Sequence, residues 1–252
     1  MTVQTPFSLR SATLGLCLAA VAAAALAQAP NTLSQQERAS GWRLLWDGSS
    51  TRGWRAAKGS AFPASGWEIK DGVLSVVETG GAESRAGGDI VSEASFAAFE
   101  LAFEFRLTPG ANSGVKYYVD TALNMGEGSA IGLEFQLLDD ARHPDANAGR
   151  DGNRTLGSLY DLIPAAASKP TRPIGEWNAA RIVSNGRHVE HWLNGAKVLE
   201  YERGSEAFRT LVAASKYKVW PAFGERPSGP ILLQDHGNRV SFRSLKIREL
   251  AP

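Results

Sequence analysis

The sequence is almost free of cysteine. Its one cysteine among 252 residues is Cys17, which lies in an apolar N-terminal run that we expect to be removed. The mature chain would then carry no thiol. That absence excludes disulfide bridges, thiol nucleophiles and cysteine-ligated zinc sites as the basis of its fold or its chemistry.

A large net charge of either sign is also missing. Lys and Arg number 27 and Asp and Glu number 26, which gives a formal net charge of +1. A nucleic-acid-binding protein needs a basic excess or a basic patch, so we expect no nucleic-acid partner. No apolar run is long enough to span a bilayer, so we expect no membrane span.

Several common catalytic motifs are absent as well. The chain has no P-loop, no G-x-G-x-x-G after a strand, no G-x-S-x-G elbow and no H-E-x-x-H. Phosphate-cradling loops, dinucleotide folds, nucleophile-elbow hydrolases and zincins are thereby disfavoured.

The N-terminus resembles a secretory signal. Arg10 is the only charge in the first 27 residues, and an apolar run from Leu14 follows it and ends in Ala25-Leu26-Ala27. A basic start, a short apolar segment and an A-x-A site predict a signal peptide over residues 1–27, cleaved near Ala27. An anchor helix is the alternative, but the run is too short to cross a bilayer. We therefore expect a periplasmic or secreted protein.

Beyond a polar leader or linker over residues 28–40, short runs of alternating apolar and polar residues predict strands. Residues 99–107, 114–120 and 131–137 alternate cleanly, as strands with one face in a core do. Asp71-Gly72 and Asn194-Gly195 predict tight hairpin turns. Residues 41–252 are therefore expected to form one all-β domain, a sandwich of two antiparallel sheets.

Three other segments stand out. Helical patterns are confined to residues 34–38 and 205–215. The apolar parity of the last strand shifts between Phe242 and Leu245, which predicts a β-bulge. The long segment 139–175 has no clear period and is rich in polar and turn residues, so we expect it to be functional.

The alternation also predicts which polar residues share a surface. The residues opposite the apolar faces of their strands are Glu104, Arg106, Lys116, Tyr118, Glu134 and Gln136. If their strands are neighbours in one sheet, these side chains form a polar wall, and curvature would turn that wall into a cleft. The alternative is an ordinary solvated sheet face. Gln136 and Tyr118 add hydrogen-bonding groups suited to sugar hydroxyls.

A paired-carboxylate site is weakly supported. The run Glu134-Phe135-Gln136-Leu137-Leu138-Asp139 has the outline of the Glu-x-Asp-x-x-Glu strand of retaining β-glucanases, but Gln136 replaces the middle acid. Retaining hydrolysis needs two carboxylates about 5 Å apart. Glu134 and Asp139 point to opposite faces of a regular strand, so Glu134 as a lone base fits better.

Two histidines are candidates. His236 shares its face with Gln234 at a strand end, which favours a site role. His191 has the parity of apolar neighbours, so a hydrogen-bonded core histidine and a site residue remain open for it. No tight ligand spacing such as H-x-H occurs. A divalent metal is therefore conceivable but not predicted, and no cofactor is expected.

Motifs spread over the whole mature chain resemble one known family. They are Gly41-Trp42-Arg43-Leu44-Leu45-Trp46-Asp47-Gly48 with Gly53-Trp54, then Asn112-Ser113-Gly114-Val115, residues 134–139, Gly157-Ser158-Leu159-Tyr160-Asp161-Leu162, Gly175-Glu176-Trp177-Asn178, residues 189–195, Leu233-Gln234-Asp235-His236-Gly237 and Val240-Ser241-Phe242-Arg243. Together they are similar to the 3-keto-disaccharide hydrolase family. One departure is Ser244, where the family commonly has Asn.

The resemblance implies a concanavalin-A-like jelly-roll sandwich that cleaves glycosides or disaccharides already oxidised at C3. A C3 ketone acidifies the C2 proton, so a base can remove it and the enolate can expel the C1 substituent, after which water adds. We cast Glu134 and His236 as the base and the acid, in either order, and Lys116 with Gln136 as donors to the developing oxyanion. The remaining substrate-binding candidates are Glu104, Arg106, Tyr118, Asp139, Tyr160, Asp161, His191, Trp192, Gln234 and Asp235. A non-catalytic, lectin-like sandwich and a conventional glycosidase stay open as alternatives.

Overall fold

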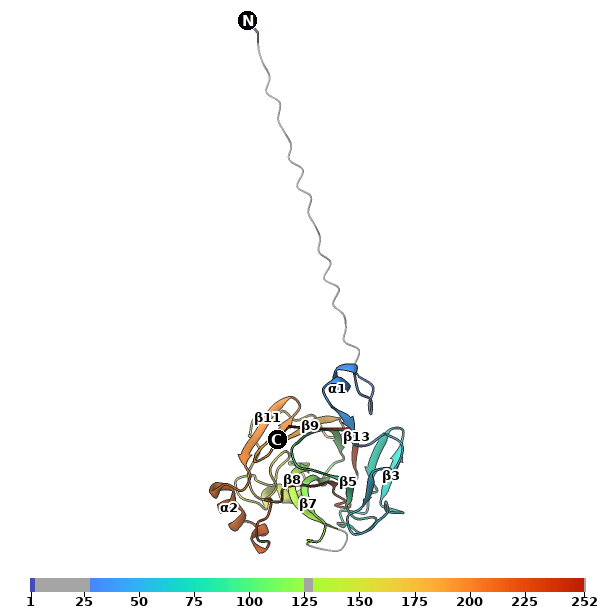
Figure 1. Ribbon diagram of the computed structural model, residues 1–252, viewed down its shortest axis with the longest axis vertical. Helices are drawn as coiled ribbons and strands as arrows, with labels where there is room; N and C mark the ends of the chain where they lie inside the picture. Colours follow the sequence, from blue (N-terminus) through green and yellow to red (C-terminus); the bar gives the residue numbers. More distant parts are fainter. Residues whose placement is uncertain (3–27, 125–128, 252) are drawn as a thin grey trace.

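The computed structural model describes residues 1–2, 28–124 and 129–251, and the predicted signal peptide lies almost wholly outside them. Two antiparallel sheets make up the fold (Figure 1). This confirms the expected all-β sandwich. None of the helices among the described residues has the length and apolar character needed to cross a bilayer.

The larger sheet has eight strands in the order β11-β10-β9-β6-β13-β4-β3, with β1 paired to β13. The bounds of its strands are β1 Arg43–Leu44, β3 Trp67–Lys70, β4 Val73–Val76, β6 Phe99–Leu107, β9 Asn178–Asn185, β10 His188–Leu193, β11 Ala196–Glu202 and β13 Val240–Glu249. Both predicted hairpin turns join strands of this sheet. Asp71 and Gly72 have φ of 51° and 74°, and Asn194 and Gly195 have 46° and 86°, the left-handed pair that a type I′ turn requires.

The smaller sheet has five strands in the order β2-β5-β12-β7-β8. Its strands are β2 Trp54–Ala56, β5 Ile90–Phe96, β7 Asn112–Asp120, β8 Ile131–Leu138 and β12 Gly229–Leu233. The helical elements lie outside the sheets and are α1 Gln35–Ala39, α2 Glu206–Ala213 and the 3-10 turns η1 Pro144–Asn147 and η2 Lys216–Val219.

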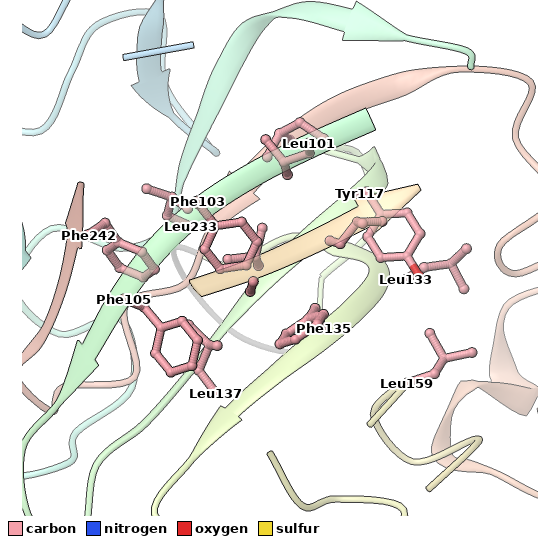
Figure 2. Close-up of a cluster of buried hydrophobic side chains, with 14 of the residues drawn as sticks. Leu101, Phe103, Phe105, Tyr117, Leu133, Phe135, Leu137, Leu159, Leu233 and Phe242 are labelled. Carbon is pink, nitrogen blue, oxygen red and sulfur yellow. The ribbon is translucent and has the colours of Figure 1, made fainter. Parts of the chain in front are cut away.

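Apolar side chains from both sheets meet between them. Phe103 of β6 contacts Phe135 of β8 edge to face, with ring centroids 5.8 Å apart. Figure 2 shows these residues within one buried cluster that also contains Leu101, Tyr117 and Phe242. β6 therefore buries one face and leaves half-buried polar residues on the other, whereas β7 and β8 are buried along almost their whole length, so other segments cover their polar outer face.

The proposed single polar wall is wrong, because its strands belong to different sheets. Residues 108–111 carry the chain out of β6, in the eight-stranded sheet, and into β7, in the five-stranded one. Glu104 and Arg106 therefore lie on the outside of one sheet, and Lys116, Glu134 and Gln136 on the outside of the other.

Tyr118 also departs from its predicted face. The register between β7 and β8 shifts between Tyr117 and Asp120, and Tyr118 has a positive φ of 52°. This bulge turns Tyr118 into the core, where its hydroxyl lies 2.5 Å from the Ala97 carbonyl oxygen and 2.6 Å from Ser184 Oγ.

Residues 28–40, expected as a loose leader, are attached to the sandwich. Ser34 and Glu37 form a capping box that starts α1, and Glu37 forms an ion pair with Lys246 of β13. Asn31 donates to the Gly72 carbonyl and accepts from the Ser244 backbone, both at 2.8 Å. Ser244 has a φ of 54° and lies in the predicted bulge of β13, which is confirmed by a register shift between Arg243 and Lys246.

Candidate active site

A cavity of about 240 Å³ opens on the outer face of the five-stranded sheet. Its floor comes from β7 and β8, and its walls come from the segments around residues 83, 160, 216 and 236. The lining residues are Glu83, Asn112, Lys116, Ser129, Ile131, Gly132, Glu134, Gln136, Tyr160, Lys216, Tyr217, Gln234 and His236. The cavity therefore brings together the predicted base, acid and oxyanion donors from separate parts of the chain.

Glu134 lies on the floor of this cavity, although it is only 5% exposed. Burial raises its pKa to about 7, while the positive charges of Lys116 and Lys216 oppose that rise. Gly114 on the neighbouring strand makes room for this side chain, because a Cβ at position 114 would lie 2.2 Å from Glu134 Oε1. A carboxylate that titrates near neutrality is suited to act as a general base.

Lys116 is the cross-strand neighbour of Glu134. Its ammonium lies 3.6 Å from Asp89 Oδ2 and donates to the Ala130 carbonyl at 3.2 Å. Burial alone would lower the pKa of Lys116, but the carboxylates of Asp89 and Glu134 raise it above its ordinary value. Lys116 therefore stays charged and supports the ionised form of Glu134.

A chain of amides connects Glu134 to His236. The Gln136 amide nitrogen lies 3.1 Å from Glu134 Oε1 and 2.9 Å from the Ser113 carbonyl oxygen when it is oriented toward these two acceptors. In the opposite orientation the Gln136 amide nitrogen donates to Asn112 Oδ1 at 3.2 Å, and Asn112 Nδ2 lies 3.2 Å from His236 Nε2. The amides of Gln136 and Asn112 therefore lie between the base and acid candidates on the cavity floor.

His236 stands at the edge of the cavity, just beyond β12. Its Nε2 is 4.0 Å from Glu83 Oε2, and its ring meets the ring of His143 at 5.9 Å. Gln234 lies on the same side and donates to Glu83 at 3.3 Å. His236 Nδ1 and Gln234 Oε1 have no hydrogen-bond partner among the described residues. The imidazole is therefore held on one side only.

The opposite wall comes from the long segment and from η2. The Tyr160 backbone donates to the Glu134 carbonyl at 3.1 Å, and its hydroxyl donates to Asp145 at 2.7 Å. The ammonium of Lys216 lies 4.1 Å from the centre of the Tyr160 ring. Burial lowers the pKa of Lys216, and the nearby charge of Glu134 opposes that change.

Three predicted substrate-binding residues lie on the eight-stranded sheet, away from this cavity. Glu104 accepts from Arg243 at 2.7 Å, Arg106 lies over the Trp177 ring at 4.8 Å, and Trp192 is stacked under Arg181 at 4.1 Å. These residues lie outside the cavity around Glu134, because strand parity selects a face but not the sheet that carries it.

His191 and Tyr118 are core residues. His191 is fully buried, with Nε2 2.8 Å from the Tyr117 hydroxyl and Nδ1 3.0 Å from the Gly157 carbonyl oxygen. Burial lowers its pKa to about 4, so it is neutral in the fold. Of its two open interpretations, the structure supports the core histidine.

Three predicted aspartates hold backbone segments and do not line the cavity. Asp139 accepts from the Gly110 N–H at 2.8 Å, and Asp235 accepts from the Gly88 N–H at 3.0 Å. Asp161 accepts from the Lys216 N–H at 2.9 Å. Asp139 also lines a different cavity, so the weak pairing of Glu134 with Asp139 does not form.

The residues that sequence reasoning missed come mainly from loops. Asn112 has the same parity as Lys116 and could have been found from the alternation. Glu83, Ser129, Lys216 and Tyr217 lie outside regular strands, so no periodicity marks the direction of their side chains.

A possible metal-ligand group lies elsewhere. Among the residues that the structure describes, His188, Glu190 and Glu200 bring their ligand atoms within 4.8 Å of one another. They lie on β10 and β11 of the eight-stranded sheet, and Lys197 forms ion pairs with both glutamates. This group is therefore not part of the cavity around Glu134.

Comparison with known proteins identifies the family. The family model described as the 3-keto-alpha-glucoside-1,2-lyase-like domain matches residues 41–248. A 3-keto-disaccharide hydrolase of Bacteroides thetaiotaomicron is 36% identical over 232 residues, which cover 84% of this chain and 79% of that protein.

Two crystal structures from Parabacteroides distasonis, provisionally described as glycosyl hydrolases, share the fold. One is 29% identical with a TM-score of 0.76 and covers 88% of this chain and all of the other. The second is 27% identical with a TM-score of 0.63, and the match covers 83% of this chain and 99% of that one. The expectation of a glycoside-cleaving enzyme is confirmed at the level of the family. The chain belongs to the 3-keto-alpha-glucoside-1,2-lyase-like family, as the motifs along its sequence indicated.

Proposed function

We propose that the protein cleaves the glycosidic bond of 3-keto-glycosides and 3-keto-disaccharides by C2 deprotonation, elimination and hydration. The observation that carries the proposal is Glu134, a buried carboxyl with its pKa raised to about 7, facing a cavity that also holds His236 and two lysines. A base of this strength is matched to removal of a ketone-activated proton near neutral pH.

The first step forms an enolate. Glu134 takes the proton from C2, and the C2–H electron pair forms a C2–C3 double bond while the ketone electrons move to the C3 oxygen. The positive charge of Lys116 stabilises the negative charge that develops, and the Gln136 amide, which lies 3.1 Å from Glu134 Oε1, orients the base. Only one carboxylate base is needed.

The second step breaks the glycosidic bond. The enolate reforms the C3 ketone and a C1–C2 double bond, and the C1–O bond breaks with its electron pair on the leaving oxygen. His236 donates a proton to that oxygen, which releases the alcohol. Water then adds to the double bond, with its oxygen at C1 and a proton at C2, so the overall change is hydrolysis.

A conventional glycosidase is the second candidate, because Glu83 is another carboxylate that lines the cavity. Glu83 is exposed and contacts Gln234, whereas Glu134 is buried on the floor. Paired-carboxylate hydrolysis acts on unoxidised sugars and places no demand on C3. The two mechanisms therefore differ in the substrate they accept: elimination requires a sugar oxidised at C3, and conventional hydrolysis does not.

One assay separates these functions. Purified protein is offered a 3-keto-disaccharide and its unoxidised parent, and product formation and binding are measured for both. We expect cleavage of the keto sugar alone, together with deuterium at C2 of the product when the reaction runs in heavy water. Cleavage of the parent would favour the conventional glycosidase, and binding without cleavage of either sugar would favour a lectin-like role.

The proposed location is the periplasm or the exterior of the cell, on the basis of the predicted signal peptide. N-terminal sequencing of the protein recovered from the periplasmic and secreted fractions tests this. A mature terminus at residue 28 is expected, and an intact Met1 in the cytoplasm would contradict it.

A further inference from the structure

Lys216 differs from the other lysine in the cavity. Lys116 already contacts Asp89 at 3.6 Å and donates to a backbone carbonyl. The ammonium of Lys216 forms no hydrogen bond or ion pair with any described residue, and it lies 4.1 Å from the centre of the Tyr160 ring and 5.3 Å from that of Tyr217. Aromatic rings attract a cation but accept no strong hydrogen bond from it.

The position of Lys216 is fixed by its backbone. Lys216 begins η2, and its N–H donates to Asp161, whose other carboxylate oxygen accepts from Arg154 at 2.8 Å. Ser215 caps the same turn through the Tyr217 N–H. The lysine is therefore placed on the cavity wall by a partly buried network, in which the side chain of Asp161 forms its ion pair with Arg154 and not with the Lys216 ammonium.

Lys216 and Glu134 line the same cavity without forming an ion pair. Each nevertheless alters the pKa of the other, so their charges interact across the cavity. The proposed reaction removes a proton from C2 and places negative charge on the oxygen of C3, the adjacent carbon. A base and a cation that line one cavity without pairing can each contact one of these two neighbouring atoms of a bound sugar.

We propose that Lys216 is a catalytic residue that donates a hydrogen bond to the C3 oxygen of the bound keto sugar and stabilises the enolate formed when Glu134 removes the C2 proton. The inference rests on the proposed function. It assigns the direct contact to Lys216 because Asp89 and the Ala130 carbonyl already engage the ammonium of Lys116, whereas only aromatic rings contact that of Lys216. Lys216 loses no internal partner when substrate binds.

The change in charge on the C3 oxygen during the reaction supports this role for Lys216. Before reaction, the ammonium meets a neutral carbonyl oxygen, and after deprotonation it meets an enolate oxygen. The interaction is therefore stronger after proton transfer, which is the condition for lowering the barrier and not merely for tightening binding. The rings of Tyr160 and Tyr217 flank the half-buried ammonium, and a partly desolvated charge interacts more strongly with an enolate than one in bulk water.

The test compares Lys216→Met, Lys216→Arg and a control, Lys218→Met, in the mature protein. Lys218 belongs to the same 3-10 turn but is exposed and does not line the cavity. We expect kcat/KM on the 3-keto-disaccharide to fall about 100-fold or more in Lys216→Met, as for loss of an oxyanion donor. Lys216→Arg should recover part of the activity, and Lys218→Met should match the wild type.

Exchange at C2 gives a second measurement. In heavy water, Lys216→Met should lose most deuterium incorporation at C2, because enolate formation is the step that it impairs. Thermal unfolding of each variant shows whether it is folded. A folded Lys216→Met with activity within about threefold of the wild type would overturn the assignment, as would covalent trapping of substrate on Lys216 by borohydride, which requires a nucleophilic amine. If the wild type does not cleave the keto sugar, the proposed function fails before this test begins.

Discussion

Replacing Glu134 with Gln should change both stability and activity, with opposite signs. The folded protein holds Glu134 with a pKa of about 7, whereas a Glu in the unfolded chain has the ordinary pKa of 4.5. The unfolded state releases the proton more readily between these values, so the wild type loses stability as pH rises from about 4.5 through 7. A Gln at this position cannot ionise, and Glu134→Gln escapes this loss.

The magnitude follows from the difference of about 2.5 pH units, at about 1.4 kcal/mol per unit. The cost to the wild type is about 1 kcal/mol at pH 5 and about 3 kcal/mol at pH 8. Glu134→Gln should therefore gain about 2 kcal/mol relative to the wild type between these pH values. The comparison between two pH values cancels any effect of Gln on packing that does not depend on pH.

Urea unfolding of the wild type and Glu134→Gln at pH 5 and pH 8 measures this difference. Glu104→Gln is the matched control, because Glu104 is a half-buried carboxylate on the outside of the other sheet, paired with Arg243. Turnover of a 3-keto-disaccharide by Glu134→Gln should fall about 100- to 10,000-fold, as for loss of a general base. The wild-type kcat/KM should rise with pH through about 7.

Two results would refute this reasoning. An equal stability difference at pH 5 and pH 8 would mean that Glu134 does not titrate between them in the fold. Unchanged turnover in Glu134→Gln would remove Glu134 from the mechanism, whatever its pKa.

Three further predictions concern the site and its surroundings. Gly114→Ala should lower kcat/KM while the protein stays folded, because its Cβ would lie 2.2 Å from Glu134 Oε1 and displace the base, and steady-state kinetics with circular dichroism checks this. Tyr118→Phe should destabilise the fold by about 1–3 kcal/mol in urea unfolding, since the Ala97 carbonyl and the Ser184 hydroxyl lose a buried partner, yet activity should be unchanged. Dialysis against a chelator should leave turnover of the keto sugar unaltered, and activity lost on dialysis and restored by one divalent cation would require a metal in the mechanism.

The structural features that the sequence predicted correctly are those determined by residues close together in the chain. The Asp71-Gly72 and Asn194-Gly195 turns form as expected because their positive φ values are a local property of these residues. Likewise β6 spans residues 99–107, as its alternation predicts. The bulge near Ser244 was also visible, because an extra residue shifts the parity of the apolar positions.

The candidate site was predicted only in part. Glu134, Gln136 and Lys116 face one cavity because they occupy alternate positions on paired strands, and this could be read from parity. The parity of Tyr118 predicted the polar face of its strand, but the bulge between Tyr117 and Asp120 turns its side chain into the core. Lys216 could not be found in this way, since its segment has no strand period.

The sequence by itself determined the strands, their buried faces, the tight turns and the motifs of the family, because each arises from residues close together in the chain. Only the tertiary structure decided which sheet each strand joined, and so which polar faces meet. It also decided the chemistry of Glu134, whose raised pKa results from burial under segments distant in the sequence. Desolvation depends on everything that surrounds a carboxyl in space, and no local pattern records that environment.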